Sequence, residues 1–407
     1  MQARSANWKP DLTRVILTLV GLTGLVLFIL ACRPSWSPDG RKVLYSYWDD
    51  GAGKAAVAVF DRKTRSSHLI FEWGNEESSN QTLAGAQWTK DGEEAIVTTY
   101  VEEAVQIVVV SVTTQRPLQM YALKKMGDLS VLPIPQVGNQ LFVVGGKAWV
   151  RLNLTTGEVL RREDKEVEDG LLYDVGGKVF YIRQIEEKAE ETKKEVGEKK
   201  TLETPRKNYE FGELDQKDLS LHPTLTLRSE ELESKGIREL TGFADVDPGS
   251  LKTAITTDAT EGKPARIVVI GKSGVEQILE VGTKEKPFKL GNPQWSRDGK
   301  MIFVSAVIEG EKTKRAEFGV VEVPVDGKVS RFDRIEEGPK EDFDEDFLTF
   351  AQIVLSPDGK LIAVTNGHVD TLPDKKGLFL LDVSRPQRPV NFYPAPALPA
   401  VSKAKKE

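Results

Sequence analysis

A pentapeptide that ends in an aspartate-glycine turn recurs along this chain and constrains its fold more than any other feature. The first copy is Trp36-Ser37-Pro38-Asp39-Gly40. The others are Trp88-Thr89-Lys90-Asp91-Gly92, Trp295-Ser296-Arg297-Asp298-Gly299 and Leu355-Ser356-Pro357-Asp358-Gly359. An apolar, strand-like run follows each copy within a few residues. Asp-Gly between two extended segments predicts a β-hairpin, because glycine adopts positive φ at no steric cost.

This hairpin is the first half of a longer repeat. A second strand–turn–strand pattern follows it, and seven copies of this second half occur, at residues 57–71, 107–121, 149–160, 209–221, 266–279, 319–332 and 378–392. Seven copies of the second half are consistent with only four clear Asp-Gly turns if the first turns of the three middle repeats have changed in sequence. These drifted turns would be Val137-Gly138-Asn139, Val175-Gly176-Gly177 and Asp247-Pro248-Gly249. At about 53 residues per repeat, the pattern predicts an all-β propeller of seven four-stranded blades, with six or eight blades as alternatives.

The pattern resembles the TolB-like propeller repeat, a degenerate relative of the WD-type repeat. The resemblance rests on the four pentapeptides and spans roughly residues 34–393. It implies a β-propeller and says little about function, because such repeats occur in periplasmic partner-binding proteins, in regulatory domains of serine peptidases and in stand-alone propellers. The family's best known member has a separate domain ahead of its propeller, whereas the first repeat here begins at residue 36. A role in that member's envelope complex is therefore not implied.

The repeat assigns structural roles to its own residues. Trp36, Trp88 and Trp295 occupy equivalent inner-strand positions, so we expect them to be buried between blades, with Leu355 in the same position of the last repeat. The turn aspartates should accept hydrogen bonds from nearby backbone and take no part in catalysis. These turns are Asp39-Gly40, Asp91-Gly92, Asp298-Gly299 and Asp358-Gly359.

The first 32 residues have the pattern of a secretory signal. The charged residues among residues 1–14 are mainly basic, and residues 15–31 carry no charge. Cys32, the only cysteine in the chain, follows. Ile29-Leu30-Ala31-Cys32 resembles a bacterial lipobox, which implies that Cys32 is lipid-modified and becomes the new N-terminus. Arg33 after this cysteine resembles the sorting pattern for the outer membrane.

An uncleaved signal anchor and a plain cleaved signal peptide are the alternatives to a lipoprotein. A membrane-spanning helix needs ~20 apolar residues, and the uncharged run from Val15 to Ala31 is slightly shorter, although Arg14 could snorkel to the interface. All three interpretations place the propeller outside the cytoplasmic membrane. We expect a periplasmic, membrane-attached protein of the cell envelope.

The composition excludes some partners and leaves two segments outside the repeat. The formal net charge is −6, so the chain lacks the basic excess of nucleic-acid binders. A charged insertion at about residues 184–207 is rich in Glu and Lys, and should form a solvated excursion between two strands of one blade. Residues 394–407, with three prolines and a Lys-rich end, should form a disordered tail.

No motif for catalysis, a metal or a cofactor stands out. His68, His222 and His368 have no metal-type neighbours in sequence. Asp342, Asp344 and Asp346 have the initial spacing of a calcium loop, but Phe347 stands where the loop needs glycine. Gly271-Lys272-Ser273 looks like the end of a phosphate loop without its first glycine, and fits a hairpin turn better. We expect no cofactor and no bound metal.

These observations favour a non-catalytic binding module. Blade strands are covered by their neighbours, so variable chemistry is confined to the loops and the central channel. The expected ligand is another protein of the cell envelope, bound on one face of the disc. The alternative is a propeller enzyme with a central-channel active site that acts on a glycan or a peptide, and the side chains that line the channel should distinguish the two.

Overall fold

The structure is a computed structural model, and its description covers part of the chain. The described residues are 33–49, 52, 54–73, 81–101, 104–124, 126, 134–145, 147–165, 170–186, 207–237, 240, 244–257, 264–283, 288–310, 314–327, 331–343, 347–366 and 376–398. The predicted signal segment, Cys32 included, lies outside them, as do residues 187–206 of the predicted insertion and His368.

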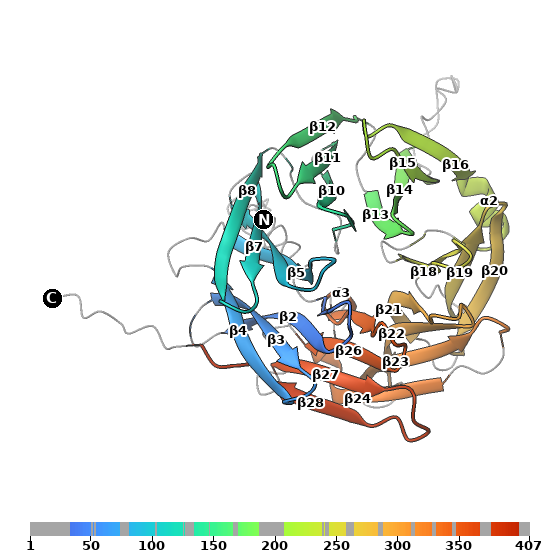
Figure 1. Cartoon of the computed structure of the whole chain (residues 1–407). Coiled ribbons are helices and arrows are strands. Elements are labelled where there is room, and N and C mark those ends of the chain that lie inside the picture. The colour runs from blue at the N-terminus through green and yellow to red at the C-terminus, as the bar shows by residue number, and fades with distance from the viewer. Residues whose placement is uncertain are drawn as a thin grey trace, which may run out of the picture.

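Seven four-stranded antiparallel sheets are arranged around a common axis, which confirms the predicted seven-bladed propeller (Figure 1). Blades 1 and 2 contain β1 (Ser35–Trp36), β2 (Lys42–Asp49), β3 (Lys54–Asp61) and β4 (Ser66–Trp73), then β5 (Gln81–Trp88), β6 (Glu94–Val101), β7 (Ala104–Ser111) and β8 (Arg116–Lys124). Blades 3 and 4 contain β9 (Gln136–Val137), β10 (Gln140–Gly145), β11 (Ala148–Asn153) and β12 (Val159–Glu163), then β13 (Gly170–Val175), β14 (Lys178–Glu186), β15 (Lys207–Leu214) and β16 (Leu221–Leu227).

Blade 5 contains β17 (Ala244–Val246), β18 (Thr253–Thr257), β19 (Ala265–Gly271) and β20 (Gly274–Val281). Blades 6 and 7 contain β21 (Phe288–Trp295), β22 (Met301–Glu309), β23 (Arg315–Pro324) and β24 (Arg331–Pro339), then β25 (Ile353–Leu355), β26 (Leu361–Asn366), β27 (Gly377–Asp382) and β28 (Val390–Pro394). Short helical pieces, α2 (Ser229–Ser234), η2 (Lys340–Asp342) and α3 (Phe347–Phe350), lie between blades in the sequence. In each blade the first strand is innermost and the last is outermost (Figure 1).

The two faces of the disc differ in their connections. In every blade, the turns between the first and second strands and between the third and fourth strands lie at one end of the sheet, and none is longer than seven residues. We call this side the tight-turn face. The connections between the second and third strands, and those between blades, lie at the other end and range from two to 20 residues. We call this side the long-loop face. Variation in loop length is therefore confined to one face.

The first turn of each blade has the predicted position, including the three drifted turns. Gly40, Gly92, Gly138 and Gly176 all have positive φ in these turns. In blade 5 the positive φ belongs to Leu251 rather than to Gly249, because the Asp247 carboxylate draws the turn together by accepting the N–H groups of Gly249 and Ser250. Glycine is also needed for space, since a Cβ at Gly92 would lie 2.9 Å from Pro38 in the neighbouring turn.

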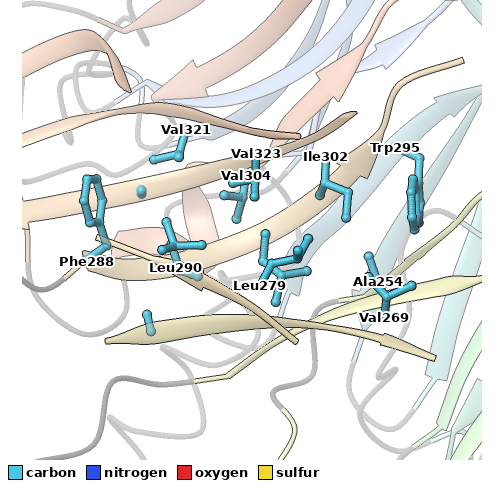
Figure 2. Close-up of a cluster of buried hydrophobic side chains, with 14 of the residues drawn as sticks. Ala254, Val269, Leu279, Phe288, Leu290, Trp295, Ile302, Val304, Val321 and Val323 are labelled. Atoms are coloured by element: carbon cyan, nitrogen blue, oxygen red, sulfur yellow. The ribbon is translucent and has the colours of Figure 1, made fainter. Parts of the chain in front are cut away.

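The hydrophobic core lies between adjacent blades and forms a series of separate clusters. Figure 2 shows the cluster between blades 5 and 6, in which Leu279 of β20 and Ile302 of β22 meet. Each cluster combines the facing sides of two sheets, as stacking along a ring requires. The largest fully buried side chains include Trp149, Tyr45, Tyr181, Phe60 and Phe142.

The three repeat tryptophans are buried, at 5–7% exposure, and each bonds to the preceding blade. The indole Nε1–H of Trp88 donates to the carbonyl of Ser35 at 2.9 Å. The indole of Trp36 donates to Val354 and that of Trp295 to Asp245, at 3.0 and 3.2 Å. Leu355, at the same position of blade 7, is partly buried and has no indole to donate. Each tryptophan therefore fills a space between blades and also joins two innermost strands.

The ring closes without exchange of strands, because blades 1 and 7 are each built from one continuous segment. Their interface combines apolar side chains of β2 and β3 with Ala363, Leu378 and Leu380. The chain then continues past β28 over blade 1, where Tyr47 donates to the carbonyl of Pro396 at 2.7 Å and the Leu398 N–H donates to Asp49 at 3.1 Å. We call residues 395–398 the C-terminal strap.

The C-terminal strap differs from the disordered tail that the sequence predicted. The sequence composition predicted a disordered tail over residues 394–407, but Pro394 completes β28 and Leu398 is 8% exposed within the seam between blades 7 and 1. Prolines at this point do not disrupt packing, because the hydrogen bonds of the strap use the carbonyl of Pro396 and the N–H groups of Ala395 and Leu398, and none of them needs a proline N–H. Residues 399–407 lie outside the described residues.

Candidate functional site

A ring of polar side chains surrounds the channel near the tight-turn face. Its members share one position, the last residue but one of each innermost strand, and six of the seven are polar. They are Ser35, Gln87, Gln136, Asp174, Asp245, Gln294 and Val354. We call this set the inner ring. No single stretch of sequence displays it, because its members are spread over seven repeats.

Several inner-ring side chains bind a neighbouring blade. The Gln87 amide donates to the carbonyl of Ile134 and accepts its N–H, at 2.7 and 2.6 Å, as a strand neighbour would. The Ser35 hydroxyl and the Asp245 carboxylate accept the N–H of the tryptophan in the next blade, Trp88 or Trp295. These bonds hold adjacent innermost strands together and engage polar groups that could otherwise meet a ligand.

The remaining polar side chains of the inner ring, Asp174, Gln136 and Gln294, make other contacts. Asp174 forms an ion pair with Lys90, which belongs to the first turn of blade 2. Gln136 donates to the carbonyl of Gly138, while its side-chain oxygen is buried without a hydrogen-bond partner. Gln294 is buried, and its amide donates to the carbonyl of its own neighbour Pro293. Blade 3 therefore holds one buried acceptor without a hydrogen-bond partner.

Arg33, Tyr173 and Asp245 influence one another electrostatically although they come from blades 1, 4 and 5. Arg33 precedes β1 and is half-buried, and its positive charge acts on the Asp245 carboxylate. Tyr173 lies on β13, and its hydroxyl is buried without a hydrogen-bond partner. The group brings together a cation, a carboxylate and a phenol, which are types of side chain that can bind a polar ligand or transfer a proton.

The environment of Asp245 raises its pKa to about 6. Burial is the main cause, because it disfavours the charged carboxylate. The hydrogen bond from the Trp295 N–H and the charge of Arg33 oppose burial and keep the pKa from rising further. The same carboxylate raises the pKa of the Tyr173 hydroxyl, to which burial contributes more. Asp245 therefore titrates near neutral pH, and Tyr173 stays protonated.

A second charged cluster lies between blades 3 and 4, near the long-loop face. Arg183 forms ion pairs with Asp164 and Glu210 at 3.1 and 2.7 Å, and all three side chains are at most 13% exposed. Tyr181 donates to Glu210, and the Trp149 indole donates to Asp164. Each charged group has a partner of opposite charge, as burial requires.

The turn aspartates form one repeated arrangement at the tight-turn face. Asp39 accepts the Ser37 hydroxyl at 2.7 Å and the N–H of Arg41 at 3.0 Å. Asp91, Asp298 and Asp358 bind a Thr or Ser hydroxyl and a turn N–H in the same way. These bonds stabilise the carboxylate and lower the pKa of all four aspartates. Two of them also lie within ion-pair distance of an arginine, Asp39 with Arg41 at 3.5 Å and Asp358 with Arg62 at 3.9 Å.

The remaining sequence candidates do not converge on the channel. His68 lies on β4 and His222 on β16, both outermost strands. Asp342 ends the short helix η2, while Asp344 and Asp346 lie outside the described residues. Lys272 and Ser273 form the turn of the hairpin between β19 and β20, as predicted. The described residues contain no cluster of three or more His, Cys, Asp or Glu side chains that could hold a metal ion.

Within the part of the chain that the structure describes, no helix combines the length and the apolar character that a bilayer crossing requires.

No protein-family model and no curated protein sequence matches this chain. Solved structures with a similar fold include the C-terminal WD40 domain of Sif2, with a TM-score of 0.48 and 11% identity over 89% of this chain and 84% of that chain. TolB from Acinetobacter baumannii has a TM-score of 0.43 and 12% identity over 74% of this chain and 65% of that chain.

An enzyme occurs among the similar structures as well. Oligogalacturonate lyase in complex with manganese has a TM-score of 0.39 and 12% identity over 91% of this chain and 77% of that chain. Identities this low concern the propeller fold alone. The comparisons include proteins with and without an enzymatic name, so they do not choose between a binding module and an enzyme.

Proposed function

We propose that this chain is a non-catalytic β-propeller binding module, attached to a membrane of the cell envelope, that takes a protein partner on its long-loop face. The observation that carries the proposal is that hydrogen bonds between neighbouring blades engage polar groups of the inner ring. Gln87, Ser35 and Asp245 direct polar atoms at the neighbouring blade rather than at the channel axis. A ring that is occupied in this way is suited to a rigid scaffold whose recognition groups lie elsewhere.

The long-loop face is the surface where recognition can vary. Its connections differ in length from blade to blade, while those of the tight-turn face are uniformly short. Loops carried on a rigid scaffold are the usual place for binding residues. The acidic helix α2 belongs to this face, since it connects β16 of blade 4 with β17 of blade 5. The net negative charge favours a protein over a nucleic acid.

Membrane attachment is proposed from the N-terminal sequence. A lipid on Cys32 would attach the mature chain, and an uncleaved segment at residues 15–31 would attach it by a helix. Mass spectrometry of the purified protein distinguishes the two, and so does fractionation of a Cys32→Ser variant. If the variant leaves the membrane fraction, the lipoprotein interpretation is supported. If it stays there and the wild type retains residues 1–31, the chain is a signal anchor.

Partner binding is tested by cross-linking in intact cells with two matched variants. Glu233→Lys reverses an exposed charge of α2 on the long-loop face, and Glu93→Lys reverses an exposed charge in a turn of the tight-turn face. A partner that binds the long-loop face should be recovered with Glu93→Lys as with wild type, and in smaller amount with Glu233→Lys. Recovery of no partner above background from any of the three would contradict the proposal.

A channel enzyme is the second candidate, and the group Arg33, Tyr173 and Asp245 is the observation that favours it. A raised carboxyl pKa beside a phenol with no hydrogen-bond partner is typical of acid–base sites. The test is turnover of cell-wall glycans and peptides by wild type, Tyr173→Phe and Asp245→Asn, with folding checked for each. Turnover that both substitutions abolish in folded protein would establish the enzyme and overturn the binding module.

A further inference from the structure

We propose a second binding site on the rim of the disc, where an extended segment of another protein adds to blade 1 as a fifth strand and packs on the exposed side of β8 in blade 2. This site goes beyond the proposed function, because it lies on the rim rather than on the long-loop face and does not depend on binding there. We call it the rim site. It consists of the free edge of β4 and four exposed residues of β8, Leu118, Met120, Ala122 and Lys124.

Leu118 and Met120 are the apolar part of the rim site. Their side chains are 51% and 55% exposed, and they belong to a set of four exposed large hydrophobic side chains in the described part of the chain. β8 carries no charge from Pro117 to Leu123. The edge strands of natural sheets are commonly protected by charged side chains, which discourage pairing with another chain. The middle of β8 lacks this protection.

Met120 continues a side of blade 2 that blade 1 covers further in. Met120 pairs with Val108 of β7, and Val108 packs with Ile70 and Phe71 of β4 in the buried cluster between blades 1 and 2. β4 therefore covers β7, and the sheet of blade 1 ends there, with no fifth strand to cover β8. A strand added to the edge of β4 would take that position and cover Met120.

The same side of other outermost strands carries ion-paired charges. In blade 3 Arg161 pairs with Glu163 at 2.6 Å, and in blade 6 Arg334 pairs with Glu337 at 2.7 Å. These positions correspond to Met120, because each lies on the side of its blade that faces the preceding blade. Blade 2 thus presents apolar side chains where blades 3 and 6 present charges.

The edge of β4 is able to pair with another strand. β4 has one neighbour in its sheet, β3, so the backbone groups on its outer side have no partner strand. Its first six residues, Ser66 to Phe71, contain no Asp, Glu, Lys, Arg or Pro. An extended segment binds such an edge through main-chain hydrogen bonds, and its alternate side chains give specificity. The rim site therefore combines hydrogen-bonding groups on β4 with an apolar surface on β8.

Lys124 indicates the chemistry of the bound segment. It pairs with Ala104 and lies on the same side of β8 as Met120, at the end of the strand nearer the long-loop face. Its side chain is exposed, and within the described part of the chain it forms no ion pair. Neighbouring strands of blade 1 are antiparallel, so a fifth strand would run from the long-loop face to the tight-turn face. The partner is thus an extended protein segment in which an acidic residue precedes apolar residues at alternate positions.

Selection from a displayed library of random peptides against the full-length protein in detergent tests the rim site. The selected peptides are labelled, and their binding to wild type, Met120→Asp and Val159→Asp is measured by fluorescence anisotropy. Val159 is the matched control, because it is an exposed apolar side chain on the outermost strand of blade 3. Both substituted side chains are exposed, so each variant should fold, and circular dichroism checks this.

The expected peptides have an acidic residue before alternating apolar residues. Met120→Asp should weaken their binding at least about tenfold, because it places a charge against the apolar side chains of the peptide. Val159→Asp should leave binding unchanged, and Lys124→Glu should weaken it. N-methylation of alternate peptide residues should abolish binding for only one of the two alternate sets, since every second N–H of a strand faces its neighbour.

Selection of no peptide, equal binding to Met120→Asp and Val159→Asp, or tolerance of both sets of N-methyl groups overturns the rim site. Sedimentation velocity covers the other occupant. Self-association of wild type that Met120→Asp abolishes would show that a second copy of this chain fills the site, and would overturn the segment of another protein. The cross-linking result for Glu233→Lys does not depend on these measurements, so the rim site and the long-loop face can fail separately.

Discussion

The repeat tryptophans act by packing and by one directed hydrogen bond each, and the two contributions can be separated. Trp88 is 5% exposed, and its indole donates to Ser35 of blade 1. We expect Trp88→Ala to reduce the free energy of unfolding by ~3–5 kcal/mol, because it opens a cavity between blades 1 and 2. Trp88→Phe keeps an aromatic ring and loses the donor, and should cost about 1–2 kcal/mol. Urea unfolding followed by circular dichroism measures both changes in stability. An unchanged midpoint for Trp88→Ala would show that Trp88 does not stabilise the interface between blades 1 and 2.

Asp245 should make the stability of the protein depend on pH near neutrality. Its pKa of about 6 in the folded state lies above the value of an unfolded aspartate, ~3.9. Its contribution to stability is therefore complete below pH ~4 and is lost as pH rises through about 6. Asp245→Asn removes this titration, so the variant should gain stability relative to wild type, by at most about 3 kcal/mol, between pH 4 and pH 8.

The control for this prediction is Asp298→Asn. The Ser296 hydroxyl and the Lys300 N–H lower the pKa of Asp298, so its contribution is present above the unfolded pKa and is lost as pH falls. The two substitutions should change the pH profile in opposite directions. A wild-type and Asp245→Asn difference that does not vary between pH 4 and pH 8 would show that Asp245 does not titrate in this range.

At the scale of elements, one hairpin turn occurs in four blades with different residues at its strained position. The N–H of Gln115, Gly157 or Leu219 bonds to the carbonyl four residues earlier, as Arg65 does in blade 1. All four have positive φ, and only blade 3 uses glycine. A residue with a Cβ in the left-handed conformation destabilises the folded state by ~1–2 kcal/mol relative to glycine. Glycine loses more conformational entropy on folding, which offsets about half of this difference.

Exchange of residues between these turns tests that cost. We expect Gln115→Gly to raise the free energy of unfolding by about 0.5–1 kcal/mol, since the exposed glutamine side chain makes no bond in the described structure. The reverse exchange in blade 3, Gly157→Ala, should lower it by ~1 kcal/mol, because a Cβ there also lies 3.4 Å from Tyr121. Thermal unfolding of the two variants is the measurement. A lower melting temperature for Gln115→Gly would mean that the left-handed turn carries no strain.

At the scale of the whole molecule, the seam between blades 7 and 1 is held by side chains and by the C-terminal strap instead of a shared sheet. Deletion of residues 395–407 removes the Leu398 side chain from the seam and three hydrogen bonds, to Tyr47, Asp49 and the carbonyl of Lys376. We expect a cost of about 2–4 kcal/mol. Deletion of residues 399–407 alone is the matched control and should leave the urea midpoint unchanged. Equal midpoints for both deletions would show that the strap does not close the ring.

The sequence by itself determined the architecture, because the signals that specify a blade are local. An Asp-Gly turn with a Ser or Thr two residues before the aspartate forms its hydrogen bonds within six residues, so Asp39 and Asp298 can be recognised without knowledge of the fold. The drifted turns were found by glycine, as at Gly138 and Gly176, whose positive φ is again a local property. The strap was missed because Leu398 is held by blade 1, more than 300 residues away in sequence.

Only the tertiary structure decided which side chains of different repeats interact and which face carries the long loops. Arg33, Tyr173 and Asp245 belong to three repeats and interact because a closed ring brings its innermost strands together. The cluster of Asp164, Arg183 and Glu210 was likewise hidden, since Arg183 stands next to a run of charges that suggested a solvated loop. Turn chemistry acts over a few residues and is written in the sequence, whereas burial and charge pairing across blades depend on how the ring closes.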